Sequence, residues 1–362
     1  MSVHDHGVLG IDTHKLTHVA VVLDGLGRHQ ATLTFAASDA GAAELLTWSR
    51  RFGSPLTAGV EGTGSYGYQL TRALQAAGLS VFEVNRPDRA NRRRKGKSDP
   101  VDAEAAARSV LAGQATAVPK NREGAVEALR ALTIARNSAV KATTTASHQI
   151  KALLVGADQQ LRDQVIVQSL LQIATRCSEL APIDGQHAAL ASLGRRWLQL
   201  HQEVLQLDTM IRALIRRTAP DLIRRPGIGI HTAAQLLITA GGNPERLHSD
   251  AAFAALCGVS PVQASSGQTH RHRLNRGGDR AANNALWTIA NNRMIHDQRT
   301  RDFAERRRST GDTLRVLKRY IAREPSPSSE PRSKPQATSS KPLDIGASTR
   351  WPRHSTHCSK QS

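Results

Sequence analysis

The chain has 362 residues, enough for about two domains of ordinary size and a linker. Its 49 Lys and Arg outnumber 30 Asp and Glu, and the resulting net charge of +19 favours a polyanionic partner such as nucleic acid. No apolar run reaches the ~18 residues of a membrane span, no signal peptide opens the chain, and three scattered cysteines form no C-x-x-C pair, which excludes a disulfide framework and predicts a cytoplasmic protein.

Strand and helix patterns alternate through a predicted first domain, residues 1–120. Residues 7–35 are typical of three strands, with the first apolar run ending at Asp12. The patterns that follow predict, in order, a helix, a strand, a helix and a strand, over 40–51, 57–61, 66–77 and 79–84. This order predicts an α/β layer with some parallel pairing and is that of an RNase H-like fold.

The rest of the chain is predicted to be helical. Apolar residues recur at three and four over about 123–172 and 187–217, which predicts two long helices forming an antiparallel hairpin within 121–218. A compact, all-helical domain is expected over 219–324. Residues 325–362 are rich in Pro, Ser, Lys and Arg, so this tail is expected to be disordered.

Four carboxylates occupy positions where such a fold would gather them. Asp12 closes the first strand, and Glu61 closes the strand expected beside it. Asp99 and Asp102 are three apart at the start of a helix, so both can project from one face. Carboxylates that converge raise one another's pKa values, and divalent cations such as Mg²⁺ or Mn²⁺ relieve the repulsion. The set predicts a site for metal-dependent phosphodiester chemistry.

Each acid also has a purely structural explanation. Asp99 before Pro100 is typical of a helix N-cap, with Asp102 completing a capping box, and Glu61 could simply end a strand. The prediction therefore rests on the set and on a neighbouring run of basic residues expected to bind phosphates. That run contains Arg92, Arg93, Arg94, Lys95 and Lys97.

Three segments resemble the motifs of a known family. GIDTHK (10–15), VEGTGSYG (60–67) and KSDPVDAEAAA (97–107) are similar to those of the DEDD transposases of the insertion sequence 110 family, bridge-RNA-guided bacterial recombinases with a RuvC-like domain. The four acids of that family fall here on Asp12, Glu61, Asp99 and Asp102. The resemblance covers about residues 7–324, and the Pro- and Ser-rich tail departs from it.

Residues 224–236 match the P-G-I-G-x-x-T-A pattern of a helix-hairpin-helix. In that motif a glycine turn and the following helix N-terminus present backbone N–H groups to a phosphate. Gly227, Gly229, His231 and Thr232 are therefore predicted to contact DNA without sequence preference. A glycine turn between packed helices is the alternative.

A serine pair, Ser265 and Ser266, opens a second basic stretch. Composition alone indicates a flexible loop with phosphate-binding side chains, and a serine beside glycine is usually a turn residue. The family pattern G-x-x-P…S-G…R-x-G falls on Gly258, Pro261, Ser266, Gly267, Arg276 and Gly278. The resemblance implies that Ser266, or Ser265 in its place, attacks the DNA phosphate to form a covalent phosphoserine. The arginines expected to contact the DNA are Arg271, Arg273, Arg276 and Arg280.

The resemblance also implies the partners. Double-stranded DNA would be the substrate, and a structured noncoding guide RNA would select target and donor by base pairing. Each site would combine halves from different subunits of a dimer or tetramer. An aromatic content of 3% fits a protein that contacts mainly phosphates and shape.

Two other functions use part of the same pattern. A RuvC-like, metal-dependent DNA nuclease would need the four acids but not Ser266. A non-catalytic helix-hairpin-helix protein would bind DNA without needing Asp12.

Overall fold

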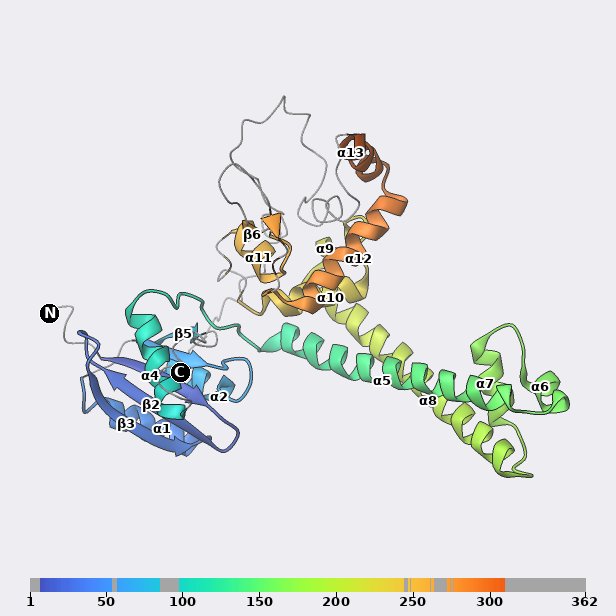
Figure 1. Ribbon diagram of the computed structural model, residues 1–362, viewed down its shortest axis with the longest axis horizontal. Helices are drawn as coiled ribbons and strands as arrows, with labels where there is room; N and C mark the ends of the chain where they lie inside the picture. Colours follow the sequence, from blue (N-terminus) through green and yellow to red (C-terminus); the bar gives the residue numbers. More distant parts are fainter. Residues whose placement is uncertain are drawn as a thin grey trace, which may run out of the picture. The chain divides into compact units, whose positions relative to one another are not determined.

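The computed structural model describes residues 7–53, 57–84, 98–243, 247, 249–260, 262–263, 272–273, 275 and 277–309 (Figure 1). The chain divides into two compact units, Met1–Asn121 and Arg122–Ser362. A mixed α/β first part followed by helices is confirmed. Within the described ranges, no helix combines the length and apolar character needed to cross a membrane.

The first unit is built on a five-stranded sheet with the order β3-β2-β1-β4-β5. The three N-terminal strands pair antiparallel, whereas β1–β4 and β4–β5 pair parallel, as the predicted crossover helices require. The strands are β1 (Val8–Thr13), β2 (Thr17–Leu23), β3 (His29–Ala36), β4 (Thr57–Glu61) and β5 (Ser80–Val84).

The two faces of this sheet bury different helices. Alternate residues of β1 point in opposite directions, so Leu9 and Ile11 join one core cluster and Val8 joins another. Helices α1 (Asp39–Ser49) and α2 (Tyr68–Ala76) cover the first face. Helix α4 (Asp99–Leu111) covers the second, where Ala103 and Ala107 are fully buried.

Helix α4 lies in direct backbone contact with the sheet. A Cβ atom on Gly10 would lie 2.0 Å from the carbonyl oxygen of Ala103, and one on Gly59 would lie 2.8 Å from that of Ala106. Only glycine permits such an approach. The contact fixes the register of α4 on β1, with the first turn of the helix toward the carboxyl end of the strand.

The second unit begins with the predicted antiparallel hairpin, made of α5 (Gly124–Val155) and α8 (Gly185–Thr218) (Figure 1). The expectation of one helix through residue 172 is wrong. The chain leaves the helix at Gly156, and new helices start where Asp158 and Ser169 cap the N-termini of α6 (Gln159–Val165) and α7 (Leu170–Ser178). Trp197 of α8 donates its indole N–H to Ser147 of α5 at 2.9 Å, inside the hairpin core.

Four of the remaining helices share one core: α10 (Ile230–Ala240), α11 (Asp250–Leu256), α12 (Arg280–His296) and α13 (Gln298–Ser309). Helix α9 (Pro220–Arg224) packs instead in a cluster with α5, α8 and α10. The expected all-helical region also contains a two-stranded antiparallel sheet, because backbone contact between Gly258 and Gly278 brings distant segments together. The two strands of this sheet are β6 (Val262–Gln263) and β7 (His272–Arg273). The predicted disordered tail lies outside the described residues.

Candidate metal centre

Two of the predicted acids end neighbouring parallel strands. Ile11 of β1 pairs in register with Val60 of β4, so Asp12 and Glu61 stand side by side at the carboxyl edge of the sheet. The hydroxyl of Thr13 donates to the backbone carbonyl of Glu61 at 2.7 Å, which ties the two strand ends together. We call this end of the sheet the acid edge.

The other two acids come from the first turn of α4. The N-cap of this helix is Ser98, so the alternative in which Asp99 serves as the cap is wrong. Asp99 is the first helical residue and is half-exposed, with its carboxylate turned toward the acid edge. Asp102 lies one turn further on and is 3% exposed, so its carboxylate is almost completely removed from water.

An imidazole that the sequence patterns did not predict joins Asp12 and Asp99. The Nε2 atom of His14 lies 3.1 Å from Asp12 Oδ2 and 3.3 Å from Asp99 Oδ1. The backbone N–H of His14 donates to Nδ1 of the buried His18 at 3.2 Å, which holds the loop in place. Residues two apart on an extended segment share a side, so the spacing of Asp12 and His14 was the available signal.

The donor atoms of Asp12, His14 and Asp99 all lie within 4.8 Å of one another, close enough to share a metal ion. Burial raises the pKa of Asp12; His14 opposes this effect, and the negative charges of Asp102 and Asp99 add to it. A carboxylate buried among like charges is stabilised by a bound cation. Carboxylate oxygens with one imidazole nitrogen form a donor set that fits a divalent ion such as Mn²⁺, and Mg²⁺ with a weaker nitrogen contribution.

Several predicted nucleic-acid contacts, and the two candidate nucleophilic serines, lie outside the described residues. They are Arg92, Arg93, Arg94, Lys95, Lys97, Ser265, Ser266, Arg271 and Arg276. The segment with the two serines connects β6 to β7, whose pairing matches Val262 with Arg273. Arg280 begins α12 and is exposed.

The turn predicted to be a helix-hairpin-helix makes several contacts within the protein. Gly227 has φ +78°, and a Cβ there would lie 2.7 Å from Cγ of Arg293. The N–H of Gly229 donates to the hydroxyl of Thr232 at 3.0 Å. His231 turns toward Asp208 of α8, with 3.6 Å between Nε2 and Oδ1. The motif glycines therefore serve packing and helix initiation, while phosphate binding by this turn remains a prediction.

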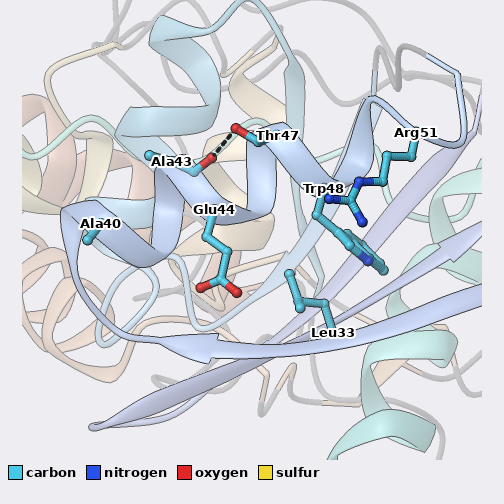
Figure 2. A pocket seen from close by; sticks show the side chains of 7 residues that line it. All are labelled: Leu33, Ala40, Ala43, Glu44, Thr47, Trp48 and Arg51. Carbon is cyan, nitrogen blue, oxygen red and sulfur yellow. Dashed lines mark hydrogen bonds between the residues drawn. The ribbon is translucent and has the colours of Figure 1, made fainter.

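A surface pocket lies on the other face of the sheet from α4 (Figure 2). It lies between α1 and strand β3, which contributes Leu33, and is bordered by the indole of Trp48, the carboxylate of Glu44 and the guanidinium of Arg51. Since none of the predicted acids lines it, the pocket is separate from the acid edge.

Two family models and one curated protein match the chain. Residues 9–157 match a model described as a DEDD transposase of the IS110 type, and residues 220–305 match one described as the transposase IS116/IS110/IS902 family. Together these segments cover more than half of the chain. An uncharacterized 43.6 kDa protein of insertion element IS110 from Streptomyces coelicolor is 32% identical over 139 residues, which are 36% of this chain and 34% of that protein.

Proposed function

The chain belongs to the IS110 family of transposases, and on this premise we propose that it cuts and rejoins double-stranded DNA as the recombinase of a bacterial insertion sequence. One observation carries the proposal. Asp12 from β1 and Asp99 from α4, with His14 between them, bring metal-ligating atoms within 4.8 Å of one another, inside the segment that matches the family.

The metal would be Mg²⁺ or Mn²⁺, held by Asp12, Asp99 and His14, with Asp102 and Glu61 at the same edge. When bound, such an ion polarises a phosphate and stabilises charge on the leaving oxygen. The imidazole nitrogen of His14 favours Mn²⁺ over Mg²⁺ as the bound ion.

The sheet, with three antiparallel strands followed by two parallel ones, supports assigning the first unit to the RNase H-like, RuvC-like folds.

The nucleophile would be Ser266, with Ser265 as the alternative. Its hydroxyl oxygen forms a bond to phosphorus and loses its proton to solvent, while the bond from phosphorus to one DNA oxygen breaks. That oxygen takes up a proton and leaves as a DNA hydroxyl. A hydroxyl on another strand would then lose its proton and bond to phosphorus, while the bond from phosphorus to the serine oxygen breaks and that oxygen takes up a proton. Each strand is rejoined without loss of a phosphodiester. Arg273, Arg276 and Arg280 would stabilise the charge on the phosphate.

The partners follow from the family and from the charge of the chain. A net charge of +19 suits phosphate backbones of DNA and of a structured guide RNA. The recombinase would work as a dimer or tetramer in the bacterial cytoplasm, with the acid edge of one subunit completed by the serine segment of another.

Trapping of covalent protein–DNA adducts tests the proposal. The full chain is incubated with Mn²⁺ and DNA that carries the ends of the element, with and without its flanking transcript, and adducts are separated under denaturing conditions. Asp12→Asn should lower adduct formation at least about 100-fold, because it removes a ligand shared by the whole cluster. Asp39→Asn, which changes an exposed acid on α1, is the matched control.

Three results separate the candidate functions. Loss of the adduct in Ser266→Ala supports recombination through that serine. Cleavage that persists in Ser266→Ala without any adduct identifies a metal-dependent nuclease instead. If neither the wild type nor Ser266→Ala cleaves DNA, and Asp12→Asn binds DNA with the affinity of the wild type, the chain is a DNA-binding protein. That result overturns the proposal.

A further inference from the structure

An exposed aromatic residue lies in the loop that leaves the acid edge. Tyr66 lies in the loop that joins Glu61 to α2, and its side chain is 57% exposed. The chain has only three tyrosines. Burying the face of a large exposed aromatic ring is favourable, so a ring near a proposed phosphate-binding centre is a candidate contact for the bound ligand.

The loop that carries Tyr66 is fixed by its own hydrogen bonds. The backbone N–H groups of Ser65 and Gly67 both donate to the carbonyl of Gly62, at 2.9 and 3.2 Å. Gly62 adopts φ +75°, which only glycine reaches without strain. The ring is therefore presented by a short, closed turn, so little conformational entropy is lost when a ligand binds it.

The same loop is anchored on the residue that follows Asp12. A Cβ on Gly67 would lie 3.0 Å from Cγ2 of Thr13, and the Thr13 hydroxyl donates to the carbonyl of Glu61. The position of Tyr66 is thus coupled to both strand ends that carry the acids. The loop that carries Tyr66 and the acids are thus held in a fixed relative position, in which one ligand could contact both.

A second exposed apolar side chain stands on the other side of Asp12. Leu16, in the turn from β1 to β2, is 77% exposed, and its carbonyl accepts from the N–H of Ala37. Among the described residues of the first unit, the other large exposed apolar side chains are Leu26 and Leu111. Both lie near Gly27, at the opposite end of the sheet from the acid edge. Tyr66 and Leu16 therefore form a separate pair at the end that carries the acids.

We propose that Tyr66 stacks on an unpaired nucleobase next to the scissile phosphate, with Leu16 contacting the nucleotide on the other side. This inference rests on the proposed function. A base within an intact duplex is covered on both faces, so only an unpaired or extruded base offers the ring a free face. The low aromatic content is consistent with this arrangement, since phosphates hold the rest of the nucleic acid and stacking is needed at one position.

Fluorescence of 2-aminopurine tests the inference. The full chain, without divalent cations, is titrated into duplexes that carry one unpaired 2-aminopurine and into fully paired duplexes of the same length. Wild type and Tyr66→Phe should quench the unpaired probe, whereas Tyr66→Ala should not. The affinity of Tyr66→Ala for the bulged duplex should fall about 5- to 100-fold, with little change for the paired duplex. Leu26→Ala is the control for an exposed side chain away from the acids.

Two outcomes overturn the inference. One is equal quenching by wild type and Tyr66→Ala. The other is a changed oligomeric state of Tyr66→Ala in sedimentation with unchanged quenching, which would assign the ring to a protein contact. Adduct formation with Mn²⁺, measured on the same variants, separates the two proposals. Adducts without a tyrosine effect leave the proposed function standing, whereas absence of adducts in every variant, wild type included, overturns that function.

Discussion

The acid edge of the first unit and the β6–β7 region of the second both depend on glycine, but they use the contact differently. A Cβ on Gly10 would lie 2.0 Å from the carbonyl of Ala103, and one on Gly278 would lie 2.2 Å from the backbone nitrogen of Gly258. The first contact seats a helix and so delivers the side chains of its first turn to a site. The second brings together two backbone segments that are distant in the chain. A motif glycine therefore marks a close approach, and its surroundings decide which function the approach serves.

The two units also treat charge differently. The acid edge gathers like charges, and burial together with Asp99 and Asp102 raises the pKa of Asp12. In the second unit, Asp208 accepts from Nε of Arg136 at 2.6 Å. Like charges gathered around a buried carboxylate mark a site that a cation would stabilise, whereas oppositely charged partners in direct contact mark a structural junction.

The largest expected effect on stability comes from adding a methyl group at a glycine whose backbone is in close contact with another segment. Gly10→Ala should destabilise the first unit by about 3 kcal/mol or more and abolish Mn²⁺ binding, because α4 must move off the sheet. Gly278→Ala should destabilise the second unit by a similar amount and leave Mn²⁺ affinity unchanged. Urea unfolding and Mn²⁺ titration by electron paramagnetic resonance measure both effects.

The matched control for these variants is Gly229→Ala. A Cβ there meets nothing within 4 Å, so the cost should stay below about 1 kcal/mol. If Gly10→Ala retained wild-type Mn²⁺ affinity, the seating of α4 would not be what positions the acids.

An intermediate effect is expected at the charged junction of the second unit. Asp208→Asn should cost about 1–2 kcal/mol in urea unfolding, because the side chains of Arg136 and Asp208 are only 19% and 22% exposed. Asp221→Asn removes a pair whose side chains are 77% and 54% exposed, and should cost less than about 0.5 kcal/mol. Equal costs for the two variants would show that burial does not distinguish these pairs.

The smallest effect concerns pH. Burial, aided by the charges of Arg136 and Arg212, lowers the pKa of His231 from its ordinary value of 6.5. The unfolded chain then takes up a proton before the folded chain does, so stability is complete above about pH 6.5 and declines as the pH falls below it. Because the side chain is 44% exposed, the loss should be a few tenths of a kcal/mol.

His231→Gln should remove this part of the pH dependence in thermal unfolding between about pH 7 and 5. His29→Gln, which changes an exposed histidine on β3, is the control for loss of a histidine elsewhere. A steeper decline in His231→Gln than in wild type would mean that folding raises the pKa of His231 instead of lowering it.

Local sequence patterns were enough to predict the elements of the first unit and the positions of the four acids. Strand β4 spans Thr57–Glu61, as its apolar run predicts, and β1 carries Asp12 near its end. Alternation, turn residues and helix starts are local properties, so a few neighbouring positions contain the information that specifies them.

Which side chains meet depends instead on tertiary packing. Packing brought His14 between Asp12 and Asp99, and it placed the closed turn that carries Tyr66 against Thr13, the residue that follows Asp12. These relations depend on the pairing of strands and on the depth at which a helix packs, which couple residues some 50 to 90 positions apart in the chain. A linear pattern names the candidates for a site, and packing between distant elements selects among them.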